Sequence, residues 1–594
     1  MKKYLSVLAI LAITGISSIS QALDFSAHGY YRLRMEDDYN LDLQNNNNVQ
    51  QGNQGNNNKV GNIFYGIQRF RLEPNLKVND NISFHATIDF LDDIGFGGNQ
   101  TRYLSVYSPL TGQINLPGGN GAFGVTGGAA GDITAGNEYG GNINFRRFYV
   151  DLLTPIGKFR LGRQASNWGL GIFQNDGNDW DSLFGDTFDR FLYIGKVDIT
   201  DNSSLALATL VDFVYQNQGP PAVTLLGNNP TSCQPAGSSP SNNGANCVQN
   251  STGISSAHDA YQFTEALVYQ RPNFEVGTYA GLRFRPGTDG LASTAVDSAG
   301  NSVNPTTGQA YGARDGTTLT YYIDLYSKWK KGPITTKLEY VYLGGKIAPG
   351  LCIPAIQTPA GSTNDLLNQP VCLSGQYDLS VNMGAVEVEG LHGSEEWKFI
   401  TGFAQGDSNP VSTTITQFGF RPDYHIGLLM FQAPLGTSPA VQINGNTVMG
   451  NRPITSNFVN NAAYVGATYK HKFDISHIVP QAQWIKLGAH VVSAWAPSDV
   501  YNFNFSELTG QPGLPRVYNA SSWYGIETDF IVEAKFFDHV FWNMTAGILF
   551  PGAAFDIKND DLANASFNPN VMNPIIFDPA ATAFAVRSTL LFEF

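Results

Sequence analysis

The sequence predicts an all-β protein, a transmembrane antiparallel β-barrel of about eighteen strands, within a range of sixteen to twenty. Three observations support this prediction. Apolar and polar residues alternate with a period of two along many segments, and the segments are joined alternately by short turns and long polar connections. After the N-terminal segment, we find no apolar run long enough for a membrane-spanning helix.

The N-terminal segment has the features of a secretory signal peptide. Lys2 and Lys3 precede the apolar stretch 4–13, and Ser20-Gln21-Ala22 provides small residues for cleavage after Ala22. We therefore expect residues 1–22 to be a signal peptide and residues 23–594 to form the barrel. The formal net charge is −14, which argues against nucleic acid as a partner.

The clearest alternation closes the chain, in 584–594. Phe584, Val586, Leu590, Phe592 and Phe594 share one parity, and Arg587, Thr589 and Glu593 share the other. The same alternation occurs in 24–35, 82–90, 274–285 and 526–536, with charged residues on one face. A barrel in a membrane needs this pattern, because its outer face meets lipid and its lumen meets water.

The connections between these segments indicate the number of strands. Short turns are expected at 78–81, 154–157, 200–203, 271–273, 331–333, 391–394 and 537–539. Long connections are expected at 36–62, 93–142, 164–189, 216–258, 286–316, 347–377, 407–458, 496–520 and 551–580. Nine long loops between two periplasmic chain ends give eighteen strands. The connection 407–458 is ambiguous, because Phe418–Phe431 is apolar enough for a hairpin within the loop or for two more strands.

About eighteen strands enclose a lumen too wide for the wall's own side chains to fill, so transport is the expected function. The inner-face parity predicts these pore-lining residues: Arg32, Arg34, Arg69, Arg71, Arg160, Arg283, Arg285, Lys337, Glu387, Glu389, Glu527 and Asp529. One interpretation is that these charges pair across strands and only solvate the wall. The other is a net basic lumen that favours anionic or polyhydroxylated solutes, including acidic sugars. On the same face Tyr30, Tyr279, Tyr322 and Tyr326 can offer surfaces for sugar stacking.

The segment 164–189 is the densest run of chemically capable residues and falls in the third outer loop. Its apolar side chains and glycines predict a loop folded inward as a constriction, with aspartates facing Arg160, Arg163 and Arg190. The predicted constriction residues are Trp168, Asp176, Asp179, Asp181, Asp186 and Arg190. A calcium site at Asp176, Asp179 and Asp181 is a weaker alternative, because the glycine and distal glutamate of an EF-hand loop are missing. No nucleophile or base accompanies the acids, so catalysis here is not expected.

The four cysteines form two local pairs within polar segments, Cys233 with Cys247 and Cys352 with Cys372. In an oxidising envelope this spacing predicts two loop disulfides. Clustered histidines or further cysteines, which metal binding would need, are not found near them. No metal and no cofactor is expected.

Several short motifs resemble those of alginate-export-type and porin-like outer-membrane barrels. They are Arg32/Arg34, Arg69/Arg71, the stretch 159–164, Glu527-x-Asp529, the turn 550–555 and the terminal Phe594. The resemblance implies a monomeric barrel near eighteen strands, an electropositive conduit, loops folded into the mouth and a role such as polysaccharide export. The large Asn/Gly-rich loops and the two cysteine pairs depart from the family pattern.

Together these patterns predict a porin-like channel in the outer membrane of a Gram-negative bacterium, passing hydrophilic, anionic or sugar-type solutes by diffusion. The expected partners are outer-membrane lipid and lipopolysaccharide, these solutes, and the barrel assembly machinery, which would read the C-terminal strand ending at Phe594. The alternatives are a surface-binding or adhesion barrel and an outer-membrane enzyme. For an enzyme the only candidate dyad is His28 and His85, expected on neighbouring strands near Asp89. Strand-like alternation begins at Asp24, so no plug domain of an energised transporter is expected.

Overall fold

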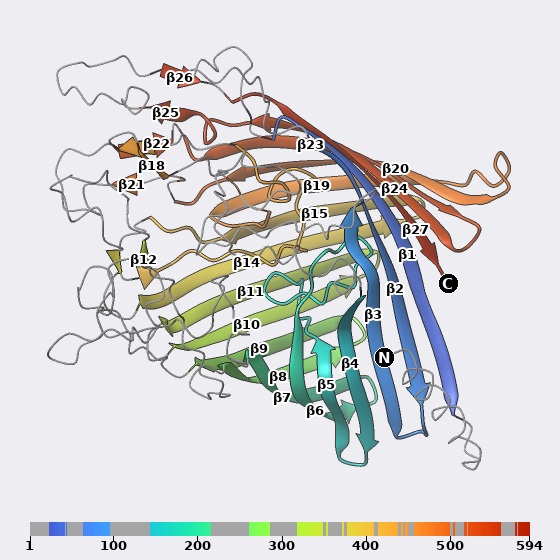
Figure 1. Ribbon diagram of the computed structural model, residues 1–594. Helices are drawn as coiled ribbons and strands as arrows, with labels where there is room; N and C mark the ends of the chain where they lie inside the picture. Colours follow the sequence, from blue (N-terminus) through green and yellow to red (C-terminus); the bar gives the residue numbers. More distant parts are fainter. Residues whose placement is uncertain are drawn as a thin grey trace, which may run out of the picture.

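The computed structural model shows an all-β chain whose long strands form one closed antiparallel barrel, which confirms the predicted fold class. In the described residues the wall has eighteen strands, in chain order around the barrel, and β1 pairs with β27 to close it (Figure 1). The wall strands are β1 (Asp24–Tyr39), β2 (Ile63–Lys77), β3 (Ile82–Gly95), β4 (Ile143–Thr154), β5 (Gly157–Ala165), β6 (Thr187–Thr200), β7 (Ser203–Tyr215), β8 (Ala260–Arg271), β9 (Phe274–Arg285), β10 (Thr318–Lys331), β11 (Ile334–Ile347), β14 (Tyr377–His392), β15 (Glu395–Ala404), β19 (Ala462–Phe473), β20 (Ala482–Trp495), β23 (Trp523–Phe536), β24 (Val540–Pro551) and β27 (Ala583–Glu593).

The structure describes only part of the chain, and the statements below concern that part. The described residues are 23–41, 43, 63–95, 143–215, 260–285, 318–347, 352–353, 371–372, 377–408, 414–436, 441–443, 446–449, 455, 457–498, 500, 503–504, 516–519, 521–559, 576–578 and 580–594. The predicted signal peptide and the pair Cys233/Cys247 lie outside them.

The two faces of the wall differ as the alternation predicts. Outward side chains such as Phe25, Phe64 and Phe530 are 64%, 72% and 69% exposed, whereas the inward Arg32 and Asp324 are fully buried. A soluble protein buries its apolar face instead, since exposing large apolar side chains to water costs free energy. The outward apolar surface therefore suits the hydrocarbon of a membrane. No helix within the described residues is long and apolar enough to cross a membrane.

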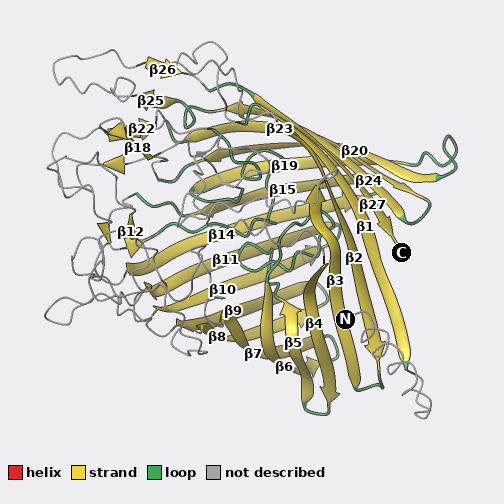
Figure 2. Cartoon of the chain, viewed as in Figure 1, coloured by secondary structure: helices red, strands yellow, loops and turns green. Residues whose placement is uncertain are grey.

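Short turns join the strands at one end of the barrel (Figure 2), and the longer connections start from the opposite ends of the strands. The seven predicted turns are all present among the described residues. An eighth, 474–481 between β19 and β20, was not predicted. Its Ile475, Ile478 and Val479 continue the apolar character of a strand, but the amides of Ile478 and Val479 both bond to the carbonyl of Ile475 and turn the chain.

The ambiguous segment Phe418–Phe431 forms neither a hairpin nor two wall strands. It belongs to the seventh long connection, 405–461, and most of it is loop. Phe420, Leu429, Met430 and Phe431 are each at most 2% exposed, in the same apolar core cluster as Ile172 of the third long connection. The apolar content of this segment therefore serves packing inside the barrel, not contact with lipid.

Short strands outside the main wall complete the described structure. They are β12 (Cys352–Ile353), β13 (Val371–Cys372), β16 (Thr414–Ile415), β17 (Val441–Ile443), β18 (Asn446–Met449), β21 (Phe503–Asn504), β22 (Arg516–Asn519), β25 (Ile557–Asn559) and β26 (Ile576–Asp578). β12 and β13 pair antiparallel and place the backbone of Cys352 directly opposite that of Cys372. The disulfide between them stays a prediction.

Candidate functional site

The third connection, residues 166–186 and called here the third loop, leaves β5 at Ala165, returns at β6 with Thr187, and folds into the lumen. Arginines of the first two strands hold it. Arg32 Nη1 donates to the carbonyls of Trp180 and Ser182 at 2.9 Å each, and Arg69 Nη1 donates to Ser182 at 2.9 Å. Both arginine side chains are fully buried. These guanidinium groups bind the loop backbone and are covered by it.

Asp181 forms the charged anchor of the same loop. Its carboxylate lies 3.2 Å from Arg34 Nη1 and 3.1 Å from Arg587 Nη1, and Arg587 also pairs with Glu36 of β1 at 3.0 Å. Burial alone would raise the pKa of Asp181, but Arg34 and Arg587 hold it below its ordinary value. Asp181 therefore remains ionised, and the loop is fixed to β1 and β27 by paired charges.

The opposite side of the third loop packs on aromatic and acidic groups of β9, β10 and β11. Trp168 stacks on Tyr279 with ring centroids 5.2 Å apart, and Phe173 lies against Tyr322 at 4.9 Å. The backbone amide of Leu170 donates to the carboxylate of Glu339. Tyr279 and Tyr322 are each 3% exposed, so the third loop covers two of the expected sugar-stacking surfaces.

Other predicted pore-lining charges pair across the wall. Arg71 Nε donates to Asp89 at 2.7 Å and Arg160 Nε donates to Asp151 at 2.6 Å. Arg283 donates twice to the side-chain oxygen of Gln262, at 3.0 and 2.8 Å. The side chain of Arg285 is not among those the structure describes. Much of the predicted basic inner face is therefore used in contacts within the protein.

Only part of the expected pairing between the loop aspartates and arginines is found. Asp186 pairs with Arg421 of the seventh connection. Of the three arginines expected to face the loop aspartates, Arg163 pairs with Asp189, which lies in the predicted segment 164–189 and belongs to β6. Arg160 and Arg190 pair instead with the wall residues Asp151 and Asp212. Periodicity identifies which residues point inward, but it carries no information on which distant carboxylate each one meets.

The calcium alternative is not supported by the described side chains. Among them no group of three His, Cys, Asp or Glu residues could hold a metal ion. Asp176 accepts a bond from the side chain of Asn178 at 2.6 Å, and Asp181 is held by arginines. Burial and the neighbouring carboxylates of Asp176 and Asp423 raise the pKa of Asp179 above its ordinary value.

A second inserted segment, 418–433 of the seventh connection and called here the seventh loop, was not predicted as part of the site. Glu527 of β23 accepts bonds from three successive backbone amides, Leu428, Leu429 and Met430, at 2.6 Å each. His490 Nε2 lies 2.7 Å from the Ile426 carbonyl oxygen. The predicted pore-lining Glu527 thus anchors a loop, and the neighbouring Asp529 is 3% exposed.

The seventh loop also contacts β14 and β19. Tyr424 donates its hydroxyl to Glu387 at 3.2 Å and receives the hydroxyl of Tyr464 at 3.1 Å. Burial is the main reason that the pKa of Tyr424 lies well above its ordinary value, so this phenol remains a hydrogen-bond donor. The only sequence signal for this loop was the apolar run 418–431 itself.

The two loops bind each other as well as the wall. Asp423 accepts from the backbone amides of Leu183 at 2.9 Å and Phe184 at 3.2 Å. The amide of Arg421 donates to the carbonyl of Ile172 at 2.8 Å, and the Arg421 side chain pairs with Asp186. The third and seventh loops therefore form one body inside the barrel.

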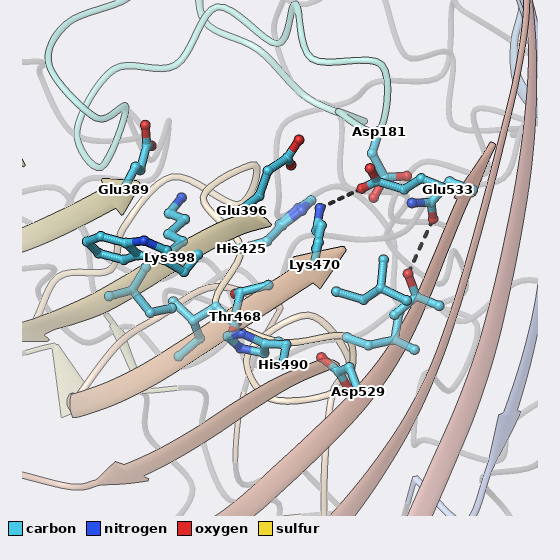
Figure 3. Close-up of a pocket in the computed structure, with 18 of the residues that line it drawn as sticks. Asp181, Glu389, Glu396, Lys398, His425, Thr468, Lys470, His490, Asp529 and Glu533 are labelled. Carbon is cyan, nitrogen blue, oxygen red and sulfur yellow. Dashed lines mark hydrogen bonds and ion pairs between the residues drawn. The ribbon is translucent and has the colours of Figure 1, made fainter. Parts of the chain in front are cut away.

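Beneath this body lies a cavity of about 590 Å³. Figure 3 shows Asp181 and His425 entering it from loops, and wall residues such as Glu389, Lys398 and Lys470 around it. Its floor includes Pro333 and Leu391, which lie at the short-turn end of the barrel. The cavity is therefore the part of the lumen that lies between the inserted loops and the short turns.

The histidine dyad considered for an enzyme is not formed. β2 lies between the strands of His28 and His85, so these residues are not on neighbouring strands. His28 lies 3.5 Å from Glu73, and His85 lies 3.6 Å from Asp151, not beside Asp89. The expected connections 36–62 and 78–81 already leave a strand between the two histidines, so the dyad did not fit the predicted strand order.

A closed wall, an apolar outer face and a charged lumen that contains two loops are the features of a membrane-spanning β-barrel. No protein-family model and no curated protein matches the chain, so membership of the alginate-export family is not shown. Solved structures similar to the chain include OmpT of Vibrio cholerae, with 8% identity, TM-score 0.30, and coverage of 97% of this chain and 99% of OmpT. Others are OccK11 of Pseudomonas aeruginosa, with 8% identity, TM-score 0.38 and 96% of both chains covered, and OpdK of Pseudomonas aeruginosa with vanillate, with 10% identity, TM-score 0.37 and coverage of 96% and 98%.

Proposed function

We propose that the chain is a diffusion channel of the outer membrane of a Gram-negative bacterium, in which the third and seventh loops narrow the lumen for small hydrophilic solutes. The observation that carries the proposal is the loop body joined by Asp423 and Arg421 and held by arginines and glutamates of the wall. A wall of about eighteen strands leaves a wide lumen, so inserted loops determine what passes.

The same proposal includes removal of residues 1–22 as a signal peptide and recognition of the strand ending at Phe594 by the assembly machinery. The apolar outer face would contact lipid and lipopolysaccharide. Within the lumen, many polar side chains remain in contact with water around the cavity, so the solute is expected to be hydrophilic rather than apolar.

Single-channel recording in planar bilayers tests the proposal. Deleting residues 172–184 removes most of the third loop and should raise the conductance, because the loop occupies the lumen. Deleting 476–479 from the exposed turn between β19 and β20 is the matched control and should leave the conductance unchanged. A wild-type barrel that does not conduct, or a 172–184 deletion with wild-type conductance, would contradict the proposed function.

A further inference from the structure

The cavity wall carries charges in a regular arrangement that differs from the arginine cluster behind the third loop. Four lysines on or beside this wall each pair with a glutamate of another strand. The pairs are Lys337–Glu389 at 2.7 Å, Lys398–Glu387 at 2.9 Å, Lys470–Glu533 at 2.5 Å and Lys486–Glu396 at 2.6 Å. Of these eight groups, Lys398, Lys470, Glu389, Glu396 and Glu533 line the cavity itself, so its wall carries no excess of positive charge.

Three of these groups are clearly open to solutes, unlike the buried arginines. The side chains of Lys398, Glu389 and Glu396 are 39%, 36% and 32% exposed. Each ammonium has three N–H donors and each carboxylate has two acceptor oxygens, so one ion pair leaves hydrogen-bonding capacity on both partners. The wall therefore presents alternating donors and acceptors to the cavity.

The remaining charges around the cavity do not favour an anion. Arg587 is committed to Glu36 and Asp181. Oδ1 of Asp529, which also lines the cavity, has no hydrogen-bond partner within the described part of the chain, and a carboxyl group adds no positive charge to the site. A solute anion would gain no net attraction here, whereas a hydroxyl group can donate to a carboxylate and accept from an ammonium.

An aromatic surface faces the same space. Trp180, at the tip of the third loop, lines the cavity and is 39% exposed although its loop lies inside the barrel. The indole offers an apolar face next to polar groups, and the ring carbons of a sugar can lie against such a face. The cavity thus combines a stacking surface with a charge-balanced hydrogen-bonding wall.

We infer that this cavity is a binding site for a neutral, polyhydroxylated solute of the saccharide class, with Trp180 as the stacking surface and the Lys–Glu pairs as hydrogen-bonding groups. The inference rests on the proposed channel function, because the cavity lies on the path through the barrel. It departs from the net basic lumen expected from the inner-face arginines, which here hold the third loop.

Binding of three trisaccharides of equal length tests the inference: maltotriose is neutral, trigalacturonate is anionic and the fully deacetylated chitosan trimer is cationic. Isothermal titration calorimetry on the detergent-solubilised full chain measures affinity without requiring conduction. Maltotriose should bind about tenfold more tightly than trigalacturonate. Its affinity should fall about tenfold in Trp180→Ala, which removes the stacking surface.

A charge variant tests whether the solute preference depends on the charges of this wall. The double variant Glu389→Gln/Glu396→Gln removes the charged partner of Lys337 and leaves Lys486 only its 3.8 Å contact with Glu533. It should therefore shift the preference toward trigalacturonate by about tenfold. The matched control is Glu265→Gln/Glu395→Gln, which makes the same chemical change at two glutamates outside the cavity lining. This control should keep the wild-type order of affinities, and circular dichroism of the strands checks folding in both variants.

Wild-type protein that prefers either charged trisaccharide, or that binds none of the three, would overturn the inference, as would an unchanged preference in the Glu389→Gln/Glu396→Gln variant. These results are independent of the channel proposal. A barrel that binds maltotriose but does not conduct would refute the diffusion channel and leave the saccharide site established.

Discussion

Replacing Glu527 by glutamine should release the seventh loop from the wall. Glu527 is fully buried, and its two carboxylate oxygens accept three successive backbone amides at 2.6 Å. A glutamine has one acceptor oxygen and presents an NH₂ group to amides that also donate. At least one buried amide then loses its acceptor, and the remaining hydrogen bonds are made to a neutral oxygen instead of a charged carboxylate.

The expected magnitude follows from the number of bonds. A hydrogen bond to a charged group contributes about 1.5 kcal/mol or more, so three amount to about 4.5 kcal/mol of docking free energy. If the glutamine retains one neutral bond of about 1 kcal/mol, the net loss is about 3.5 kcal/mol. Each 1.4 kcal/mol is a factor of ten, so the undocked population should rise by about 300-fold.

Two measurements detect release of the seventh loop from the wall. Hydrogen exchange at residues 428–430 should accelerate by a similar factor, because these amides are protected only while the loop is docked. Single-channel records should show a higher mean conductance or new open levels. Glu389→Gln is the matched control for the exchange measurement, since Glu389 lies on the same inner face but bonds to Lys337 and not to the loop. Unchanged exchange at 428–430 in Glu527→Gln would refute the assignment of Glu527 as the anchor.

Three further outcomes follow from the structure. Burial and nearby carboxylates raise the pKa of Asp179, so its charge opposes folding at neutral pH and this penalty disappears as pH falls through the raised pKa. Asp179→Asn should therefore raise the thermal midpoint at pH 7 and not at pH 3.5; equal shifts at both would contradict this. Arg421→Met removes the pairing with Asp186 and should accelerate exchange in both loops, whereas an effect confined to the seventh loop would show that they are not joined. Peptides that contain Cys352 and Cys372 should be found cross-linked by mass spectrometry before reduction. Free alkylated cysteines at these positions would exclude the disulfide. Loss of the disulfide should lower the free energy of unfolding by about 3 kcal/mol.

Much of the wall could be predicted from the sequence because lipid outside and water inside impose a period of two on every strand. Phe584–Phe594 shows this best, since its parity, its apolar face and its place at the barrel closure are all found in the structure. Connection lengths then gave the strand number. The turn 474–481 was missed because its isoleucines and valine resemble a continuing strand, while the turn itself depends on local backbone bonds to Ile475.

The site could be predicted only in part, for a physical reason. An inward fold of the third loop followed from its apolar residues, but the partners of its polar groups depend on contacts between segments far apart in sequence. Arg32 meets the carbonyls of Trp180 and Ser182, and no periodic pattern marks a backbone carbonyl as an arginine's acceptor. The seventh loop was the larger omission, since its apolar run fitted a lipid-facing strand as well as a buried loop.

The position of the arginines changes how charge in this lumen should be tested. Arg69 is fully buried and donates to Ser182, so replacing it with glutamate would place a carboxylate beside a carbonyl oxygen and beside Asp89. That change would disrupt docking of the third loop before it altered the field felt by a solute. A shift in ion selectivity in such a variant would therefore report loop release. Selectivity is better tested at Lys398 or Glu389, whose charges are exposed in the cavity and hold neither loop.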